Sequence, residues 1–269
     1  MEGSFDGAKQ PWRRMAGAAF GLGTQLLFFV TVWYLFWFLY GDGRAASPHF
    51  WFIDSLLALQ FAVVHSWLLL PSVREGLKRW LPAELYGCLF CVATCLGLLV
   101  AFAFWHRSPV VLWNLQGPLG VAMQVAFGLS WAALLYSLSL TGLGYQTGLT
   151  QWLYWLRRQR LPRREFEPRG AYRWLRHPVY LSFLGLVWFT PRMTLDHALL
   201  TGLWTVYIFF GSYLKDQRLA HYLGERYRAY QRRVAGYPLL PWGPLGKLRT
   251  RPAAVTPVPA QGSSGRQAA

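Results

Sequence analysis

Long, uninterrupted apolar runs dominate the hydropathy pattern of this chain. They show neither the 3.6-residue periodicity of an amphipathic helix nor the alternation of a half-buried strand. Four runs come first, at about 16–40, 50–70, 85–105 and 119–140. Each is close to the ~20 residues that a helix needs to cross a hydrocarbon core of ~30 Å. The pattern therefore predicts a four-helix membrane region over residues 16–142.

Two shorter apolar runs follow a basic, polar stretch. They lie at 179–190 and 195–214 and are separated by Pro191 and Arg192. As a helix, the first would be only about 18 Å long, which is short for a complete crossing. We expect the pair to form a helical hairpin that leaves and returns on the same face of the membrane. The predicted fold class is an all-α, multi-pass transmembrane protein with five to six membrane helices and a C-terminal helical hairpin.

The polar segments complete the predicted organisation. Residues 1–15 form an N-terminal segment, and residues 143–241 combine a basic loop, the hairpin and a second polar region. The stretch 242–269 is rich in Pro, Ala, Gly and Ser and lacks the apolar residues that a core requires. It is therefore predicted to be a disordered tail.

Composition and charge agree with a membrane protein and set its orientation. Of the 269 residues, 54% are hydrophobic and 14% charged, against about 25% charged in soluble domains. The formal net charge is +16, but no base-stacking or groove-reading motif accompanies it, so nucleic-acid binding is not indicated. In the predicted topology every Lys and Arg lies on one side except Arg44, Arg107 and Arg192. The positive-inside rule then makes both termini cytoplasmic, and a bacterial inner membrane is the expected location.

Several polar residues lie inside the apolar runs. Cys88, Cys91 and Cys95 share one helical face, which favours buried packing thiols over a disulfide or a metal site. His65 is interpreted as a hydrogen-bonding residue between helices, together with its neighbours Gln60 and Ser66; a place in a substrate cavity is the alternative. Asp54 is expected to cap a helix or face water, and His106 at a helix boundary carries no functional prediction.

The first candidate site lies just before the hairpin. Pro178 suits the first turn of a helix, and Tyr172, Arg176, His177 and Tyr180 crowd around that helix start. A helix N-terminus with cationic and hydroxyl neighbours is suited to an anion. The alternative is ordinary snorkelling of Arg and anchoring of Tyr at the membrane interface.

A second polar cluster follows the hairpin. Asp216 stands among basic residues, and Tyr227 and Tyr230 share a helical face, as do Arg226 and Arg233. Because both ends of the hairpin return to one side, this cluster is expected to fold against the first. The resulting pocket would admit a water-soluble cofactor from the cytosol and an apolar substrate from the bilayer. The alternative is a basic amphipathic helix on anionic lipid.

Together the two clusters resemble the isoprenylcysteine carboxyl methyltransferase-like membrane enzymes. The shared pattern is Gly-x-Tyr-Arg-x-x-Arg-His-Pro-x-Tyr at 170–180, a hairpin, an acidic position before Leu, and Gly-x-x-Tyr-x-x-Tyr-x-x-Arg-Val at 224–234. Within that group the chain is most similar to the NnrU-like branch that contains methanethiol S-methyltransferases, with further similarity at 60–66 and 190–197. The resemblance is strong over 170–234 and diffuse from about residue 50.

The resemblance implies methyl transfer from S-adenosylmethionine at a cytoplasmic cofactor site. The expected acceptor is a small or lipophilic thiol entering from the membrane, with methanethiol converted to dimethyl sulfide. The residues that match the family's cofactor-binding segments are Tyr172, Arg176, His177, Pro178, Tyr180, Tyr227 and Tyr230. Asp216 and Arg233 fall at positions implied to be catalytic, and no metal is implied. Nearby arginines would favour a thiolate nucleophile, whereas an Arg fork would suit a carboxylate acceptor.

The chain departs from the family pattern at two places. Lys215 stands where the first of two glutamates is usual, and Ala235-Gly236 replaces Pro followed by a basic residue. These departures leave two alternatives open. One is methylation of a lipid amine or of an isoprenylcysteine carboxylate, and the other is a non-enzymatic NnrU-like membrane protein with a degenerate site.

Overall fold

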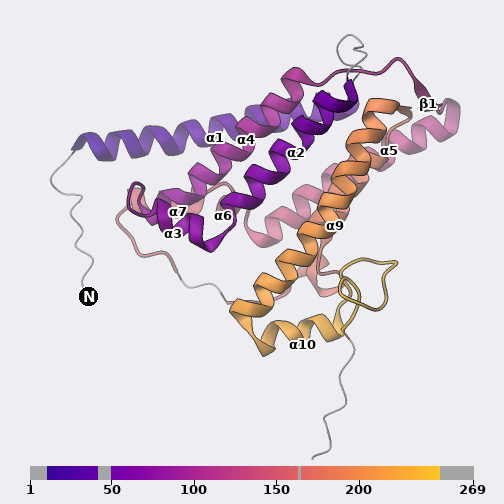
Figure 1. The fold of residues 1–269 in the computed structure, drawn as a ribbon. Helices are drawn as coiled ribbons and strands as arrows, with labels where there is room; N and C mark the ends of the chain where they lie inside the picture. Colours follow the sequence, from indigo (N-terminus) through magenta and orange to yellow (C-terminus); the bar gives the residue numbers. More distant parts are fainter. Residues whose placement is uncertain (1–10, 42–49, 163–164, 249–269) are drawn as a thin grey trace, which may run out of the picture.

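The computed structural model of the protein describes residues 11–41, 50–162 and 165–248. Within these ranges, five helices are long and apolar enough to cross a membrane (Figure 1). They are α1 (Pro11–Tyr40), α2 (Phe50–Leu68), α4 (Tyr86–Phe104), α5 (Gly117–Thr141) and α9 (Leu195–Leu223). The four N-terminal runs and the last run are thereby confirmed as helices, and the chain is an all-α, multi-pass membrane protein.

Shorter elements connect these helices. They are α3 (Pro71–Leu77), η2 (Ala83–Leu85), β1 (Val111–Asn114), α6 (Leu143–Gln146), α7 (Leu149–Leu156), η3 (Gly170–Arg173), α8 (Pro178–Trp188), β2 (Arg192–Thr194) and α10 (Glu225–Arg233). Two helix boundaries differ from the hydropathy pattern. Helix α1 includes residues 11–15 of the predicted N-terminal segment, and residues 1–10 lie outside the described part of the chain. Helix α9 continues nine residues beyond Leu214 through a polar sequence.

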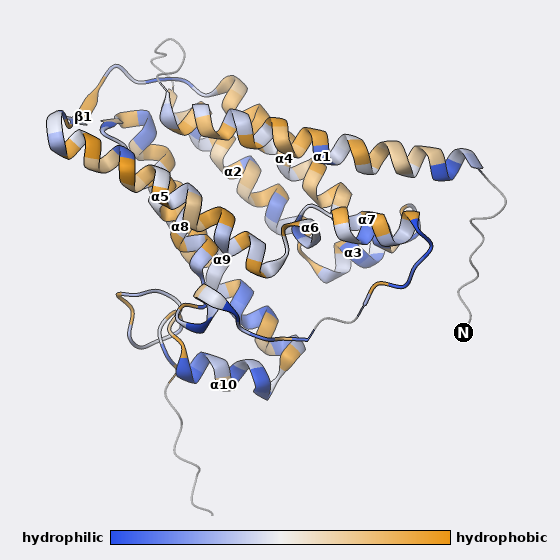
Figure 2. Cartoon of the chain, turned by 180° about the vertical axis from the view of Figure 1, so that it is seen from behind, coloured by the Kyte–Doolittle hydropathy of each residue, from blue (hydrophilic) through white to orange (hydrophobic). Residues whose placement is uncertain are grey.

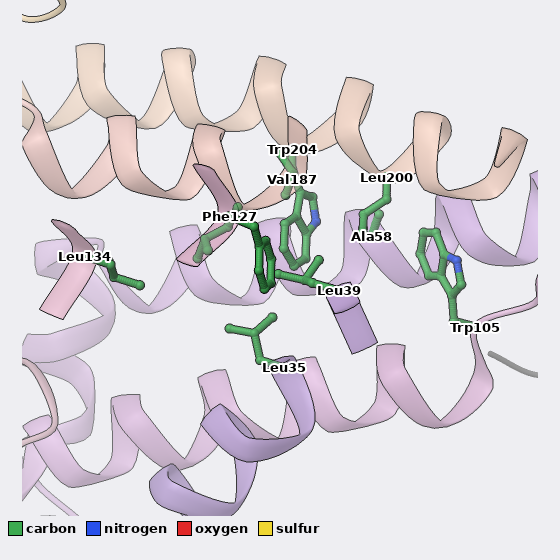
Figure 3. Packing of buried hydrophobic residues seen from close by; sticks show 10 residues of the cluster. Leu35, Leu39, Ala58, Trp105, Phe127, Leu134, Val187, Leu200 and Trp204 are labelled. Atoms are coloured by element: carbon green, nitrogen blue, oxygen red, sulfur yellow. The ribbon is translucent and has the colours of Figure 1, made fainter. Parts of the chain in front are cut away.

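The five long helices and the shorter α8 pack in the spatial order α1, α4, α2, α9, α8, α5. Phe36 of α1 meets Phe127 of α5 with ring centroids 5.8 Å apart, so the two ends of this series also touch. The largest buried cluster lies between them and draws on α1, α2, α5, α8 and α9, including Leu39, Val187 and Trp204 (Figure 3). One continuous core therefore fixes the hairpin α8–α9 against the N-terminal helices.

The outer surfaces of the long helices are apolar. Large side chains such as Phe29 on α1, Val125 on α5 and Val206 on α9 are exposed. Figure 2 shows hydrophobic colour along these helices and hydrophilic colour on α10 and α3. Such a surface is unfavourable in water and suits the hydrocarbon of a bilayer.

Two glycines on α1 make room for α7. The indole nitrogen of Trp152 donates to the Gly17 carbonyl at 2.9 Å. A Cβ atom at Gly17 would overlap Trp155, and one at Gly21 would overlap Trp152. These glycines let a short helix of the basic loop lie directly on a membrane helix.

The tip of the hairpin carries a small sheet that the hydropathy pattern does not reveal. Strand β2 pairs antiparallel with β1, which lies in the loop between α4 and α5, and Asn114 faces Arg192 in the register. Helix α8 has 11 residues and is about 16 Å long. The pairing nevertheless brings the hairpin tip to the level of the α4–α5 loop, so the predicted helical hairpin reaches that side of the bundle.

A buried polar network, here called the tip-end network, ties this loop to α2 and α9. Asp54 accepts from the backbone N–H of His106 at 3.0 Å, and its Oδ1 lies 3.3 Å from His106 Nδ1. Asp196 accepts from the backbone N–H of Ser108 at 2.9 Å and from the Trp105 indole at 3.2 Å. Both aspartates are 0% exposed. The expectation that Asp54 faces water is therefore wrong, because Asp54 is buried and binds His106 of this loop.

The polar residues inside the membrane helices connect neighbouring helices. His65 Nδ1 lies 3.2 Å from the Thr94 hydroxyl of α4, and Gln60 donates to the Gly97 carbonyl at 2.7 Å. Ser66 bonds the Tyr207 hydroxyl of α9 at 3.2 Å. This confirms the interhelical interpretation of His65. Cys88, Cys91 and Cys95 are buried free thiols, as predicted.

Candidate active site

The Arg-His-Pro sequence lies beside the chain that follows α10, and Figure 1 shows α10 at the end of the bundle opposite β1. Asp216 lies 21 residues after the start of α9 at Leu195, which corresponds to about 32 Å along a helix. That distance is close to the ~30 Å thickness of a hydrocarbon core. This end, here called the motif end, therefore lies about one membrane thickness from the tip-end network.

Turn residues set the entry and exit of the motif-end helices. Gly170 has φ +50°, and a Cβ atom there would overlap the Tyr136 hydroxyl. Gly224 has φ +57° and separates α9 from α10. Left-handed backbone favours glycine at both positions. Pro178 starts α8, where its missing N–H leaves no helical bond unmade.

Arg176 is a buried connector between three segments of the chain. Its Nε and Nη2 donate to Asp216 Oδ2 at 3.1 and 2.8 Å. Nη1 donates to the carbonyls of Val234 at 2.6 Å and Gly246 at 2.8 Å, and Nη2 also donates to Pro244 at 3.1 Å. These bonds engage all five N–H donors of a guanidinium. Arg176 therefore joins α8, α9 and the chain after α10, and it has no donor left for a cofactor.

Asp216 is 1% exposed and is fully engaged. Besides its fork with Arg176, it accepts a short hydrogen bond from the Tyr227 hydroxyl of α10. His177 Nε2 lies 3.2 Å from the same carboxylate. The structure thus brings Asp216 together with Arg176, His177 and Tyr227, as the resemblance implies. Its oxygens hold the cluster in place, which suits a positioning role better than proton transfer.

Backbone bonds hold the segment after α10 against the Arg-His-Pro sequence. The N–H of Arg176 donates to the Ala235 carbonyl at 2.9 Å, and that of His177 to Gly236 at 3.3 Å. Gly236 in turn donates to the Leu245 carbonyl at 2.8 Å. A Cβ atom at Gly236 would overlap that carbonyl and lie 3.0 Å from His177 Cδ2. The departure from the family pattern at 235–236 is therefore accommodated by close packing that requires glycine.

The predicted tail contributes to this packing. Its described part, residues 242–248, includes the Pro244 and Gly246 carbonyls that accept from Arg176, and Leu248 N–H donates to Gln231 at 3.1 Å. These residues belong with the motif end rather than with a disordered tail. Residues 249–269 lie outside the described part of the chain.

His177 is buried among the site residues with both ring nitrogens lacking a hydrogen-bond partner in the described residues. Its Nε2 is near Asp216 but is not aligned for a hydrogen bond. The ring lies between Tyr180 and Tyr237, with centroids 5.6 Å from each. Burial lowers the pKa of His177, and the Lys215 and Arg176 charges act in the same direction against the opposing effect of Asp216. The imidazole is therefore neutral at pH 7.

The tyrosines of the motif end are gathered as the sequence predicts. The Tyr230 hydroxyl donates to the Tyr172 carbonyl, and Phe166 stacks edge-on against Tyr227 and Tyr230 with centroids 5.4 Å away. Burial raises the pKa of Tyr172 to about 12 and raises the pKa of Tyr227 and Tyr230 as well. These hydroxyls stay protonated at physiological pH, and those of Tyr227 and Tyr230 donate hydrogen bonds.

Arg233 is not brought into the cluster. Its side chain is exposed, and its Nε donates to the Ala229 carbonyl one turn earlier at 3.3 Å. Within the described residues, its hydrogen bonding thus stays on its own helix. The geometry gives no support to the predicted catalytic role of Arg233.

Two further site residues were missed by the sequence analysis. Tyr237 packs on His177 and donates to the Ser212 hydroxyl at 3.0 Å. Phe166 covers the two tyrosines of α10. Neither stands at a spacing that marks a site. The only sequence signal for either residue is that it is aromatic and lies close to one of the two motifs.

Comparison with known proteins now adds to this geometry. The chain is 32% identical over 236 residues to a methanethiol S-methyltransferase of Pseudomonas sp. (strain GM41(2012)), covering 82% of this chain and 89% of that one. It is 33% identical over 196 residues to a methanethiol S-methyltransferase of Mycobacterium tuberculosis, covering 71% and 78%. This chain belongs to the methanethiol S-methyltransferase family. Nurim of Rattus norvegicus is 25% identical over 235 residues, covering 79% and 89%.

No family model and no solved structure matches the chain. The family assignment therefore rests on the pairwise similarities, and the geometry of the motif end comes from this structure. The similarity to the first relative covers most of the chain, so it is not confined to one short motif. It also agrees with the family resemblance inferred from the sequence.

The residues present fit S-adenosylmethionine. The cofactor carries an adenine ring, a sulfonium, an ammonium and a carboxylate, and it needs aromatic contacts and hydrogen-bond partners. His177 supplies two buried ring nitrogens that the described residues leave unpaired. Tyr180 and Tyr237 supply the flanking rings. Buried polar atoms are rarely left unpaired without a reason, and a bound ligand is such a reason.

Proposed function

We propose that this protein is an integral-membrane, S-adenosylmethionine-dependent methyltransferase that converts methanethiol to dimethyl sulfide. The observation that carries the proposal is the complete Arg176–Asp216–Tyr227 cluster, with His177 unpaired beside it. The chain that contains it is 32% identical to a methanethiol S-methyltransferase over 82% of its length. A degenerate site would be expected to have lost part of this cluster.

In the proposed site, one set of residues contacts the cofactor and another holds those residues in position. His177, Tyr172, Tyr180, Tyr227 and Tyr230 are the residues proposed to surround the cofactor, with Pro178 fixing the helix start beneath them. When bound, the cofactor supplies an electrophilic methyl group on a sulfonium. The donors of Arg176 are all used inside the protein. We therefore assign to Arg176 and Asp216 the positioning of the site rather than direct contact.

The site favours transfer by excluding water and by holding groups in place. The motif end is largely buried, and its cluster is fixed by hydrogen bonds from four segments of the chain. Methyl transfer to a thiolate is an in-line displacement, so alignment and desolvation supply most of the rate. A small thiol partitions into the bilayer and can reach the motif end from the membrane side.

The motif end is proposed to face the cytoplasm of a bacterial cell, in the inner membrane. The support is the distribution of Lys and Arg, which gather near the motif end and are sparse near the hairpin tip. The donor is a cytosolic metabolite, so this orientation gives it direct access. Both termini would then be cytoplasmic.

The test is binding of radiolabelled S-adenosylmethionine to purified full-length protein, with dimethyl sulfide measured in the headspace after methanethiol is added. Wild type and the control variant His221→Ala, whose histidine is exposed, are expected to bind and to form product. His177→Ala is expected to lose binding while still inserting in the membrane. A folded wild-type protein that neither binds the cofactor nor forms product would exclude the proposal.

A further inference from the structure

The ammonium group of Lys215 has no carboxylate partner. Its Nζ lies over the Tyr180 ring, 5.3 Å from the centroid. Within the described residues, no hydrogen bond or ion pair of Lys215 accompanies this cation–π contact. The side chain is partly buried on α9, beside the motif-end cluster. Because a charge removed from water is costly unless it is paired, an anionic ligand would stabilise this ammonium.

The neighbouring charges do not supply that counter-ion. Asp216 is the next residue, but its carboxylate is turned to Arg176 and Tyr227. Arg218, three residues on, adds a second positive charge close enough to interact with Lys215. The titratable and charged groups that interact with Lys215 or with the Tyr180 ring beside it are Tyr172, His177, Tyr180, Tyr207, Asp216, Arg218 and Tyr237. His177 and the tyrosines are neutral at pH 7, so this region has an excess of positive charge.

The face of α9 that carries Lys215 leads from the membrane interior to the site. Tyr207, Gly211, Lys215 and Arg218 are spaced by four, four and three residues, which places them on one helical face. At Gly211, a Cβ atom would meet only Tyr180, at an ordinary 3.9 Å. Tyr207 bonds Ser66 of α2. A small acceptor bound beside Gly211 on this face would lie next to Lys215 and Tyr180.

We propose that Lys215 binds the acceptor as its thiolate anion, and so selects a thiol over an amine substrate. The inference rests on the proposed function and names the acceptor side of that same site. The thiol loses its proton to water, and the resulting thiolate pairs with the ammonium over the Tyr180 ring. Its sulfur then forms a bond to the methyl carbon, and the electron pair of the broken carbon–sulfur bond remains on the donor's sulfur. The products are a neutral sulfide and a neutral thioether.

Positive charge near a thiol stabilises the thiolate and lowers the pKa of the bound acceptor. A protonated amine acceptor would instead be repelled by Lys215 and Arg218. A positive charge at position 215 therefore favours an anionic acceptor over a cationic one. It does not remove any member of the Arg176–Asp216–Tyr227 cluster.

The experiment compares Lys215→Met, Lys215→Arg and the control Lys78→Met, all in the full-length protein. Lys78 is an exposed lysine paired with Glu75 in the loop after α3, so its loss removes the same charge away from the site. Three measurements are made: the kinetics with methanethiol (kcat and KM) from neutral to alkaline pH, the dissociation constant of radiolabelled S-adenosylmethionine, and the ultraviolet absorbance of thiolate. The absorbance is recorded with methanethiol and S-adenosylhomocysteine, where no transfer can occur.

We expect Lys215→Met to raise KM at neutral pH by about tenfold or more, the size of a lost charge-assisted contact. The difference should shrink as the pH approaches the solution pKa of the thiol, because the thiolate then forms without help. Wild type, Lys215→Arg and Lys78→Met should show enzyme-bound thiolate at neutral pH, and Lys215→Met should not. Cofactor affinity should be the same in all four proteins.

Two results would overturn the proposal. One is a Lys215→Met enzyme with the wild-type KM and pH profile, and the other is a loss of cofactor affinity in that variant, which would place Lys215 on the donor instead. Failure of the proposed function has a different signature. In that case wild type forms no dimethyl sulfide at any pH, while the thiolate absorbance still reports whether Lys215 binds the anion.

Discussion

The two ends of the helix bundle each bury aspartates next to basic residues, but the two networks have different partners. At the tip end, Asp54 and Asp196 accept mainly from backbone N–H groups of one loop and from the Trp105 indole. At the motif end, Asp216 accepts from two side chains, and its partner Arg176 binds backbone carbonyls of a third segment. The tip-end network holds one loop against two helices. The motif-end cluster instead joins segments that lie up to 70 residues apart in the sequence.

The difference extends to what each network leaves unpaired. The tip end has one unpaired carboxylate oxygen, Asp54 Oδ2, in the described residues. The motif end has both nitrogens of a neutral histidine and, beside them, the ammonium of Lys215 over a tyrosine ring. Unpaired donors and acceptors of several chemical types in one place suit a polar ligand. This comparison indicates that buried charge serves structure at one end and structure with binding at the other.

The largest effect is expected from Arg176→Ala at the motif end. The variant leaves Asp216 buried without its cation and frees four backbone carbonyls, so the free energy of unfolding should fall by about 3–5 kcal/mol. Cofactor binding should be lost with it. Thermal unfolding in detergent and radiolabelled cofactor binding measure the two effects. An unchanged unfolding temperature together with lost binding would show that Arg176 contacts the cofactor directly.

A smaller loss is expected from Asp196→Asn at the tip end. Asparagine keeps one acceptor but loses the charge that faces Arg107, 3.6 Å away, so the free energy of unfolding should fall by about 2 kcal/mol. The cofactor dissociation constant, measured in the same preparation, should stay at the wild-type value. A tip-end variant that weakened cofactor binding would break the comparison between the two ends.

Gly236→Ala tests how closely the segment after α10 must pack. The added methyl group overlaps the Leu245 carbonyl and presses on the His177 ring, and overpacking of this kind costs about 1–3 kcal/mol. We expect reduced stability and weaker cofactor binding, both measured on the purified variant. Gly202→Ala, where nothing lies within 4 Å of the new atom, is the matched control. Equal behaviour of the two variants would contradict the assignment.

The pH dependence of stability should report the neutral state of His177. Burial lowers its pKa in the folded protein, so the unfolded chain binds a proton first as the pH falls. The contribution of His177 is complete above the ordinary histidine pKa of about 6.5 and is lost as the pH falls toward the lowered value, by at most about 1.4 kcal/mol per pH unit. Unfolding measured across this range should show a steeper slope in wild type than in His177→Gln, and the difference between the two slopes is the contribution of His177.

The smallest effect is expected from Arg233→Ala. Its exposed side chain bonds only a carbonyl of its own helix among the described residues, so stability should change by no more than about 0.5 kcal/mol. Because the Arg233 side chain lies outside the motif-end cluster, kcat for methanethiol should stay near the wild-type value. The family resemblance implies a catalytic role instead, and a large fall in kcat with unchanged stability would restore that assignment.

Much of the architecture was predictable because the bilayer imposes simple requirements. A spanning helix needs a long apolar run, and each such run stands out in this sequence. The positions of Tyr172, His177, Asp216, Tyr227 and Tyr230 in one cluster also followed, because a hairpin returns its two ends to one side. These inferences used only length, hydropathy and connectivity.

Other features depended on contacts between distant segments. The polar end of α9 is helical because Asp216 is paired from both sides, which hydropathy does not report. Strands β1 and β2 are too short to show a pattern. Residues 242–248 look like a flexible tail by composition, but their carbonyls are acceptors for a buried arginine.

The sequence by itself determined the membrane helices, the hairpin and the family motifs, since hydropathy and motif spacing are properties of the chain alone. Only the tertiary structure decided what each polar residue does. In the folded protein Arg176 links three segments of the chain, and the side chain of Arg233 is exposed. The Lys215 ammonium has no ion-pair partner among the described residues, and the His177 ring nitrogens have no hydrogen-bond partner there. The physical reason is that the function of a buried charge depends on which partners surround it, and those partners come from other parts of the chain.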